Sequence, residues 1–482
     1  MRVLFVYSTR DCLSARHPLP SLQDIHIGLS YISTFLKSKG HSTRLAVVDS
    51  ESPEQRVAVI ERIVADFDPQ LVGFTAVSTQ YPFVVTVAKQ LAQRWPDKFL
   101  LLGGVHASVC AEVVSRDPWN AVCVGEGEYA TAELVAQLEA GRNPSNIPNL
   151  WFKRADGTIE KNPCRDYLQS LDELPFPDRE MWHPWVQPDG FSRHMIQPSR
   201  GCPYQCTYCS NHALRKLAGG KYVRLRLPDA IVRELVEMRK QYPGATDVYL
   251  QSETLAVNIQ WLAELSRQIK ALNATLATPL VFTCNFRVAP HLVTDEVFDA
   301  LARANVRTVE IGLESGSERI RREVLRRDYS NEDFQRTVTL ARQRGMRVNV
   351  YNLIGIPSET PADHKETIAV NHRACPDRSL TSIFFPYPGT DLHRQCEKEG
   401  LLQGNAGLTA ERKVASLDLP TFRRKEIQRA YDWFEFHVYR DHRPLHFRVR
   451  KVIRNKIDAH PWVFHSFMRL LPLWHALRRR AT

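Results

Sequence analysis

Three cysteines share the stretch Ser199-Arg-Gly-Cys202-Pro-Tyr-Gln-Cys206-Thr-Tyr-Cys209, at intervals of four and three residues. An expected strand, Met195–Gln197, comes directly before it, so the stretch is predicted to form a loop at the carboxyl end of that strand. Thiolates are the usual ligands of iron–sulfur clusters, and so tight a loop can supply three ligands to one cluster. The spacing therefore predicts a four-iron cluster whose fourth iron has no protein ligand.

A structural zinc site is the alternative use of these thiols. Structural zinc sites normally have four Cys or His ligands in two pairs, and here His212 could be the fourth ligand. The ten cysteines of the chain are too few and too scattered for a disulfide scaffold. The clustered thiols therefore indicate metal binding in a reducing compartment, and their spacing favours the iron–sulfur cluster over zinc.

Six strand and helix units are expected from Met195 onward. Each expected strand except the last precedes a stretch with helical apolar spacing. The strand candidates are Met195–Gln197, Asp247–Gln251, Val281–Asn285, Thr308–Gly312, Arg347–Ile354 and Ser382–Pro386. This series predicts a partial (β/α)6 barrel, and in barrels of this kind the functional side chains lie at the carboxyl ends of the strands.

The amino-terminal part shows the same alternation of strands and helices. Its pattern predicts an α/β domain with a doubly wound, flavodoxin-like parallel sheet of five strands. The strand candidates are Arg2–Tyr7, Ser42–Val48, Leu71–Thr75, Phe99–Leu102 and Ala121–Val124. Ligands bind such sheets beyond the carboxyl ends of the strands, which is where this domain has its paired glycines.

Four parts of the chain are distinguished by these patterns. They are the first α/β domain (1–143), a proline-rich linker (144–189), the barrel (190–395) and a basic, mainly helical carboxyl-terminal region (396–482). Proline cannot continue a helix, so Pro444, Pro461 and Pro472 are expected to divide the last part into short helices.

The formal net charge of +11 is concentrated at the carboxyl end. From Thr421 to Thr482 there are 15 Lys and Arg against 5 Asp and Glu, a net charge of +10, so the remaining chain is close to neutral. A near-neutral body argues against a nucleic-acid partner for the main domains. The tail is also rich in aromatic residues, which leaves two expectations: a solvated helical cap over the barrel mouth, or peripheral contact with an anionic membrane.

The sequence shows no targeting or membrane-spanning segment. It contains no run of about 18 apolar residues, and the apolar part of Met1–Tyr7 is too short for a signal peptide. We therefore expect a cytoplasmic protein whose basic tail could bring it to a membrane surface.

The cysteine spacing, with Tyr208 directly before the last cysteine, is similar to that of the radical S-adenosylmethionine (SAM) superfamily. Three later segments resemble the barrel of that family in order: Gly312-Leu-Glu-Ser315-Gly-Ser, Asn352-Leu-Ile-Gly-Ile356-Pro357 and Pro386-Tyr-Pro-Gly389-Thr390. The resemblance implies a [4Fe–4S] cluster on Cys202, Cys206 and Cys209. The implied SAM-binding residues are Tyr208, Glu253, Asn258, Arg287, Glu314, Ser315, Ile356 and Pro357.

Several of these side chains have chemistry that suits SAM. Glu314 and Ser315 can accept hydrogen bonds from ribose hydroxyls, and Arg287 can pair with the SAM carboxylate. Many relatives have an acidic pair followed by an aromatic residue after the second barrel strand, and this chain does not. Glu253 and Asn258 keep one acid and one amide there for the SAM amino group.

The amino-terminal domain resembles the cobalamin-binding domain of the cobalamin-dependent radical SAM subgroup. The implied cobalamin-binding residues are Thr75, Ser78, Gly103, Gly104, His106, Gly125, Glu126 and Gly127. Cobalamin domains of the methionine synthase type supply a cobalt ligand from an Asp-x-His-x-x-Gly motif. Asp24-Ile-His26-Ile-Gly28 is one residue short of that motif, so His26 is expected to be an ordinary loop histidine and the cobalt to have no protein imidazole below it.

The resemblance implies methylation of an unactivated carbon through a 5′-deoxyadenosyl radical and methylcobalamin. The implied partners are a small-molecule, natural-product or lipid-like substrate and an electron donor such as flavodoxin or ferredoxin. No catalytic side chain is identifiable. The alternatives are a cobalamin-binding enzyme that rearranges, cyclises or oxidises its substrate, a methylthiotransferase with a second cluster near Cys12, Cys110 and Cys123, and a non-catalytic sensor.

Overall fold

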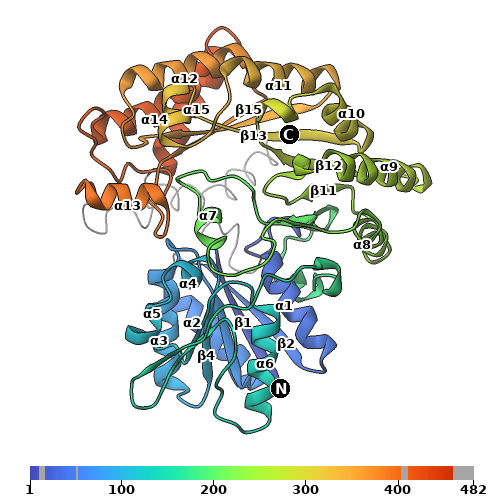
Figure 1. Ribbon diagram of the computed structural model, residues 1–482, viewed down its shortest axis with the longest axis vertical. Coiled ribbons are helices and arrows are strands. Elements are labelled where there is room, and N and C mark those ends of the chain that lie inside the picture. The colour runs from blue at the N-terminus through green and yellow to red at the C-terminus, as the bar shows by residue number, and fades with distance from the viewer. Residues whose placement is uncertain (10–16, 50–52, 403–410, 460–482) are drawn as a thin grey trace, which may run out of the picture.

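The amino-terminal sheet has seven strands, of which the first five run parallel as expected (Figure 1). The computed structural model describes residues 1–9, 17–49, 53–402 and 411–459. The strand order is β2-β1-β3-β4-β5-β6-β7. The strands are β1 (Arg2–Thr9), β2 (Ser42–Asp49), β3 (Leu71–Thr75), β4 (Phe99–Gly103), β5 (Ala121–Cys123), β6 (Leu150–Lys153) and β7 (Ile159–Lys161).

Helices cover both faces of this sheet, which explains the continuous apolar runs of its central strands. All five residues of β3 are buried, as is typical of a parallel strand covered on both sides. The helices are α1 (Ile27–Ser38), α2 (Pro53–Phe67), α3 (Tyr81–Arg94), α4 (Val105–Val109), α5 (Val113–Arg116) and α6 (Glu128–Glu139).

The last two strands lie in the segment that the sequence predicted to be a linker. β6 pairs antiparallel with β5 and β7 pairs antiparallel with β6, so the domain extends to Lys161 instead of ending at residue 143. The prediction of a linker over 144–189 is therefore wrong in its first part. These strands are only four and three residues long, so proline and polar neighbours hide their alternation.

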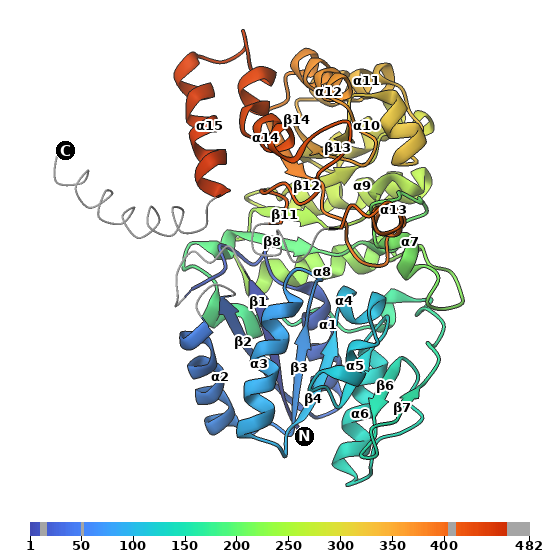
Figure 2. The same ribbon diagram turned by 90° about the vertical axis from the view of Figure 1, so that its left-hand side faces the viewer.

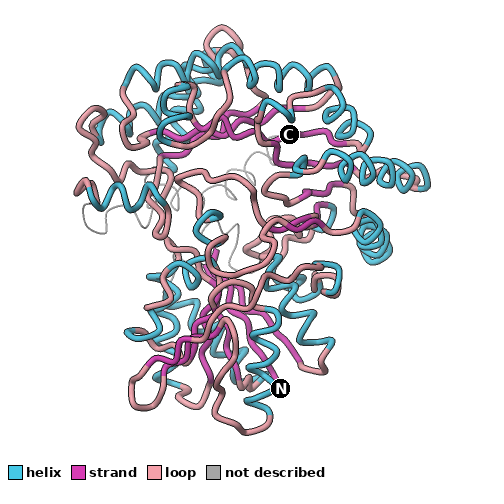
Figure 3. Tube along the Cα trace, viewed as in Figure 1, coloured by secondary structure: helices cyan, strands magenta, loops and turns pink. Residues whose placement is uncertain are grey.

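The second sheet has six parallel strands in the order β15-β14-β13-β12-β11-β8, which confirms the predicted partial barrel. Figure 3 shows the two sheets as separate groups of magenta strands with helices outside them. The strands are β8 (Arg193–Ile196), β11 (Asp247–Leu250), β12 (Val281–Phe286), β13 (Val306–Glu314), β14 (Arg347–Ile354) and β15 (Arg378–Ile383).

The last barrel strand begins earlier than predicted. We expected Ser382–Pro386 because that segment is more apolar, whereas β15 spans Arg378–Ile383. Ser379 is buried and accepts a hydrogen bond from Asn352 Nδ2 at 3.2 Å, so a polar partner on β14 compensates its burial. Apolar content alone could not reveal this pairing.

The barrel helices lie on the convex side of the sheet. Two of them begin with a capping box, at Ser330 with Asp333 and at Thr360 with Asp363, which fixes where each helix starts. The helices are α8 (Pro228–Gln241), α9 (Ile259–Thr275), α10 (Asp295–Arg303), α11 (Asn331–Gln343) and α12 (Pro361–Ala374). The cysteine loop between β8 and α8 also carries β9 (Ser199–Arg200), α7 (Asn211–Leu214) and β10 (Arg224–Leu225).

The carboxyl-terminal region is helical in its described part. It contains α13 (Asp391–Lys398), α14 (Arg424–Val438) and α15 (Leu445–Asp458), and Pro444 is the N-cap that separates the last two, as predicted. Figure 2 shows α15 beside α14 at the edge of the molecule, and these two helices are in contact. The predicted helix breaks at Pro461 and Pro472 lie outside the described residues.

One apolar core continues from the first domain into the barrel. It includes Phe5 and Leu101 of the first sheet together with Ile196 and Leu250 of the second. The carboxyl ends of the first set of parallel strands therefore lie close to the cysteine loop, and the two predicted binding sites lie near each other.

Candidate active site

The three cysteines of the loop each receive a polar contact from the surrounding protein. Arg287 Nη1, which follows β12, donates a hydrogen bond to Cys206 Sγ at 2.9 Å. Cys202 Sγ lies 3.8 Å from Thr254 Oγ1, and the backbone N–H of Asn211 donates to Cys209 Sγ at 3.5 Å. Hydrogen bonds to the sulfurs are what proteins use to tune a bound iron–sulfur cluster.

No three His, Cys, Asp or Glu side chains of the described residues converge on the position of a single metal ion. A four-iron cluster does not require such convergence, because each thiolate binds a different iron. Burial raises the pKa of the Cys209 thiol to about 11 and also raises the pKa of the Cys202 thiol. Both groups therefore hold protons until iron displaces them.

His212 is not arranged as a zinc ligand. Its Nδ1 lies 2.8 Å from the carbonyl oxygen of Cys209, and its Nε2 lies 3.2 Å from Asp391 Oδ1. The backbone therefore occupies Nδ1, and Nε2 lies beside the Asp391 carboxylate without a hydrogen bond of its own, so the four-ligand zinc alternative loses its fourth ligand.

A cavity of about 180 Å³ opens beside Cys202 at the carboxyl ends of the barrel strands. It is lined by Cys202, Glu253, Thr254, Asn285, Phe286, Arg287, Glu310, Gly312, Glu314, Arg327 and Tyr351. Arg287 Nε is buried and has no hydrogen-bond partner among the described residues. An unpaired guanidinium N–H among carboxylates suits a zwitterionic ligand with a carboxylate of its own, so the lining of this cavity fits the amino-acid end of SAM.

Three of the predicted SAM-binding residues line this cavity, and a fourth is joined to it. Glu253, Arg287 and Glu314 are lining residues. Arg327 Nη1 donates hydrogen bonds to Tyr208 Oη at 2.9 Å and to Glu314 Oε1 at 3.1 Å. The buried guanidinium therefore holds the ring of Tyr208, a predicted SAM-binding residue, and the predicted ribose-contacting carboxylate of Glu314 in one cluster.

The other four predicted SAM-binding residues do not line the cavity. Asn258 is the N-cap of α9, and its Oδ1 accepts the backbone N–H of Trp261 at 2.9 Å, so its side chain serves the helix. Ser315 is fully buried and accepts the N–H of Ser317 at 3.2 Å. Ile356 and Pro357 are buried beyond β14, where Ile356 belongs to the core under the carboxyl-terminal helices.

Sequence reasoning missed two polar groups that organise this end of the barrel. Arg327 has no local signal, because its partners are distant in the sequence. Glu359 is fully buried, and its Oε2 accepts the backbone N–H groups of Gly355 at 2.6 Å and Ile356 at 3.1 Å. The turn Gly-Ile-Pro-Ser-Glu at 355–359 could have indicated such a carboxylate, since the backbone N–H groups of a turn that follows a strand need an acceptor.

A second cavity, of about 240 Å³, lies at the carboxyl ends of β1, β3, β4 and β5. Its lining includes six glycines: Gly28, Gly73, Gly103, Gly104, Gly125 and Gly127. Gly104 has φ +92°, and a Cβ there would lie 2.6 Å from Thr75 Oγ1. The bare backbone leaves room for one arm of a corrinoid, such as its nucleotide tail, so the cavity fits cobalamin.

The predicted cobalamin-binding residues divide into three groups. Thr75 and the four predicted glycines line the cavity. Ser78 and His106 do not line it. Instead, His106 Nδ1 lies 3.1 Å from Ser78 Oγ, and the His106 ring packs on Tyr81. Glu126 lines the cavity, but its carboxylate also forms ion pairs with Arg200 and Arg224 of the barrel domain at 3.1 and 2.9 Å.

His26 lies closer to this cavity than the sequence indicated. Its Nδ1 accepts the backbone N–H of Leu29 as the N-cap of α1, and its Nε2 lies 3.4 Å from Thr75 Oγ1 inside the cavity lining. Burial lowers the pKa of His26 to about 4, so the ring is neutral near pH 7. The ring is therefore a helix cap that forms part of the cavity wall.

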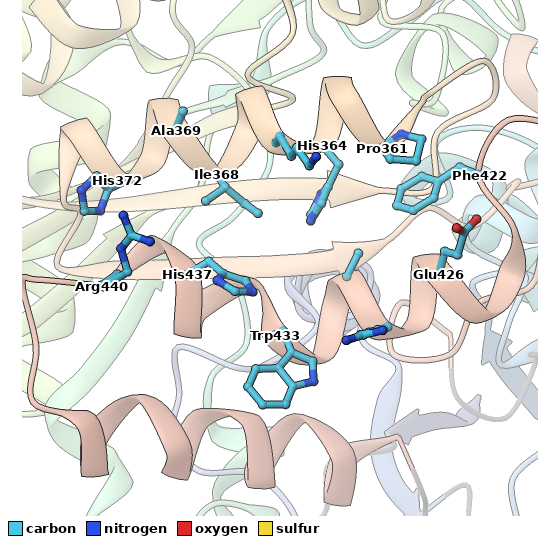
Figure 4. A pocket seen from close by; sticks show the side chains of 13 residues that line it. Pro361, His364, Ile368, Ala369, His372, Phe422, Glu426, Trp433, His437 and Arg440 are labelled. Carbon is cyan, nitrogen blue, oxygen red and sulfur yellow. The ribbon is translucent and has the colours of Figure 1, made fainter.

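A larger cavity than these two lies away from the cysteines. It is a groove of about 870 Å³ between α12 and α14, with His364, Ile368 and His372 on one side and Trp433 and His437 on the other (Figure 4). None of the predicted site residues lines it. Chemistry, and not volume, therefore identifies the two smaller cavities as the candidate active site.

Comparison with known proteins identifies two domains: residues 196–370 match the radical SAM superfamily, and residues 22–135 match the B12 binding domain. The uncharacterized methyltransferase PH0819 of Pyrococcus horikoshii is 28% identical over 379 residues, 78% of this chain and 79% of that protein. Anaerobic magnesium-protoporphyrin IX monomethyl ester cyclase of Rubrivivax gelatinosus is 22% identical, over 76% of this chain and 65% of that protein. Hopanoid C-3 methylase of Methylococcus capsulatus is 25% identical, over 76% of this chain and 67% of that protein.

The fold is also that of a solved structure. The radical S-adenosylmethionine methyltransferase TsrM of Kitasatospora setae, with cobalamin and a [4Fe–4S] cluster bound, superposes with a TM-score of 0.66 at 19% identity. The match covers 84% of this chain and 79% of TsrM, which confirms the predicted fold class. This chain therefore has a radical SAM domain preceded by an amino-terminal B12-binding domain, and its fold is that of a solved radical SAM methyltransferase.

Proposed function

We propose that this enzyme uses a [4Fe–4S] cluster, SAM and cobalamin to methylate an unactivated carbon of a small-molecule, natural-product or lipid-like substrate. One observation carries the proposal: Arg200 lines the glycine-edged cavity, and Cys202, two residues further along, lines the cavity at the barrel strand ends. A substrate between the two cavities would be in reach of both cofactors. The hopanoid methylase and the uncharacterized methyltransferase among the relatives support methyl transfer.

The bound cofactors would supply a carbon-centred radical and a transferable methyl group, so the protein's own task is binding and orientation. Cys202, Cys206 and Cys209 would hold the cluster, with the Arg287 N–H on Cys206. Glu253 would take the SAM amino group, and Arg287 its carboxylate. These roles need no Ser/His/Asp set or paired general acid and base.

The seam between the domains would keep water away from the reacting carbon. Arg200 bridges to Glu126 at 3.1 Å and to Glu128 at 2.7 Å, and its side chain is only 14% exposed. Such buried, fully paired charges close a seam without leaving unsatisfied groups. A radical intermediate needs this exclusion because water and oxygen would divert it.

A second candidate is radical chemistry without methyl transfer. The Rubrivivax gelatinosus cyclase is similar to this chain over 76% of this chain's length, so a related protein performs cyclisation. Mass spectrometry of products formed with methyl-labelled SAM separates the candidates: a product heavier by one labelled methyl group supports methylation, and an unlabelled rearranged or oxidised product supports the alternative.

Methylthiolation has less support. Burial raises the pKa of the Cys123 thiol to about 12, and the side chain packs in the core of the first sheet as a small apolar residue. Cys110 ends α4, and Cys12 lies outside the described residues. These positions give no specific reason to infer a second cluster.

The remaining partners are also proposals. We propose a flavodoxin or ferredoxin as the electron donor, because the cluster must be reduced, and peripheral membrane contact through the basic carboxyl-terminal region. None of the described helices is long and apolar enough to span a membrane. The proposed contact is therefore with the membrane surface.

Anaerobic reconstitution followed by iron and cobalt quantification tests the cofactor assignment. We expect about four irons and one corrinoid per chain, with SAM cleaved on reduction. The variant with alanine at all three cysteines should lose the iron and keep the corrinoid. A variant that retained a four-iron cluster and SAM cleavage would refute the assignment, and wild-type protein without cobalt would refute the cobalamin part alone.

A further inference from the structure

Helix α15 carries a row of exposed apolar side chains. Leu445, Val449 and Ile453 are 59%, 41% and 55% exposed. They are spaced by four residues, so they lie above one another on one face of the helix. Single exposed apolar residues are ordinary on protein surfaces, but a continuous row marks a surface that meets another apolar phase.

A basic row runs beside the apolar row. His446, Arg450 and Arg454 each follow one apolar residue directly and are exposed. Across Leu445–Asp458 there are five Lys and Arg against one acid, Asp458. The helix therefore combines apolar contact with strong positive charge on adjacent faces, which is the composition of interfacial amphipathic helices.

The other face of the helix is fixed to the protein. Val452 is buried, and Lys451 Nζ forms an ion pair with Glu435 of α14 at 2.7 Å. Arg448 lies over the Phe436 ring of α14, 4.7 Å from its centroid. These contacts hold the apolar row in its outward direction, so a docking surface is preformed.

The groove on the other side of α14 has the same combination of properties. Its walls include Ile368, Ala369 and Trp433 (Figure 4). Arg429 and Arg440 are also among its lining residues. His364 Nδ1 is buried there without a hydrogen-bond partner among the described residues. Apolar and cationic groups therefore extend across two sides of α14.

We propose that α15 is a docking helix for an anionic lipid bilayer, with Leu445, Val449 and Ile453 entering the headgroup boundary and Arg450 and Arg454 pairing with lipid phosphates. The inference rests on the proposed peripheral membrane contact and specifies its surface. It does not depend on the reaction. A lipid-like substrate would reach the enzyme by this surface.

Charge disfavours the other occupants of this face. A second copy would oppose one basic row with another, and like charges repel. The chain's own segment 460–482 contains four Arg and no acid, so it offers no complementary charge either. A nucleic acid would pair with the basic row but would leave the apolar row exposed to water.

Flotation of the full-length reconstituted enzyme with vesicles tests the proposal. The vesicles are phosphatidylcholine alone, or phosphatidylcholine with phosphatidylglycerol. We expect at least tenfold more enzyme on the anionic vesicles, and loss of most binding in a variant with Leu445→Ser, Val449→Ser and Ile453→Ser. Arg450→Glu with Arg454→Glu should remove the preference for anionic vesicles.

Leu227→Ser is the matched control, because Leu227 is 58% exposed but lies on the barrel, outside α15. It should float like the wild type. Equal flotation of wild type and the triple serine variant would overturn the proposal, as would equal binding to neutral and anionic vesicles. Dimerisation, or binding to RNA, that is lost in the same variant while vesicles do not bind would also overturn it. SAM cleavage is measured in parallel, so failure of the proposed reaction would be seen separately.

Discussion

Glu359 shows how one buried carboxylate organises the end of a barrel strand. It accepts two backbone N–H groups in the turn after β14 and has no exposed surface. Burial raises its pKa to about 8, whereas an exposed Glu has a pKa near 4.5. Between these values the folded protein holds a proton that the unfolded chain releases, so stability falls as pH rises through this window.

We expect Glu359→Gln to remove this pH dependence while keeping an oxygen acceptor for the two N–H groups. Glu359→Ala should cost about 2–4 kcal/mol, because two buried donors lose their partner. Urea unfolding under anaerobic conditions at pH 5.5 and pH 8 measures both effects. Equal slopes of stability against pH in wild type and Glu359→Gln would contradict the assignment.

Arg287 acts on the cluster site through its hydrogen bond to Cys206 Sγ. Removing a positive donor from a cluster sulfur disfavours the reduced, more negative state. We expect Arg287→Met to lower the reduction potential of the bound cluster by tens of millivolts, on the order of the hydrogen-bond effects known for such clusters. A redox titration followed by EPR measures this shift, and an unchanged potential at full iron content would show that the contact is absent in the loaded enzyme.

Among single residues, the sequence predicted those that belong to a short motif and missed those whose contacts join distant parts of the chain. The three cysteines and Glu314 stand in short motifs, and Glu253 follows an expected strand, so the roles predicted for them could be read from local sequence and its resemblance to the radical SAM family. Arg327 joins Tyr208 to Glu314 across more than a hundred residues of sequence, so no motif contains the three together. Asn258 was predicted to bind SAM because its amide follows the second barrel strand. In the structure the same amide caps helix α9.

The glycine-edged strand end of the first domain is the element on which we expect cobalamin binding to depend. Gly104 has φ +92°, and a Cβ there would approach Thr75 Oγ1 to 2.6 Å. We expect Gly104→Ala to cost about 2–4 kcal/mol, the backbone strain and the clash together, and to lower the bound cobalt severalfold. Thermal unfolding and cobalt analysis of reconstituted protein measure the two effects.

Gly40 provides a matched control for that substitution. Its φ of +86° is similar, but a Cβ there would meet nothing within 4 Å. Gly40→Ala should therefore show only the backbone strain, about 1 kcal/mol, with cobalt content unchanged. Similar losses of cobalt in both variants would indicate a general loss of folding instead of a blocked cavity.

Among the elements, strands with buried apolar runs were predicted, even the three-residue β5, whereas the partly exposed β6 and β7 were not. β3 is five buried residues between turns, and its bounds match the expectation. β7 reads Ile-Glu-Lys and becomes a strand only because β6 offers it a pairing edge. Such strands exist through their partners, which a single sequence does not reveal.

The whole molecule is held together by one core that crosses the domain boundary and by the charges at the seam. Arg200 pairs with Glu126 and Glu128, whose side chains are 20% and 6% exposed. Arg200→Ala leaves the buried Glu128 without a cation, whereas Glu126 keeps Arg224, so we expect a loss of about 3–5 kcal/mol and a lower cobalt content. Urea unfolding and cobalt analysis measure these outcomes.

Arg233→Ala is the control for this substitution. Arg233 and Asp229 form an ion pair 3.6 Å apart on α8 with both side chains more than half exposed. Exposed pairs contribute about 0–1 kcal/mol, so this variant should unfold almost like the wild type. Two separate unfolding transitions in the wild type would contradict the shared core.

The backbone that carries Arg200 and Cys202 has a consequence for how the enzyme is assembled. Gly201 alone separates them, with φ +84° and a Cβ position 2.2 Å from the Tyr222 carbonyl oxygen, so this backbone packs directly against the main chain of Tyr222. We therefore expect a cofactor bound in either cavity to alter binding in the other through the main chain. Such coupling is reciprocal. The affinity of the apoprotein for its corrinoid should change when iron is loaded first, and iron retention should change by the same factor when the corrinoid is loaded first.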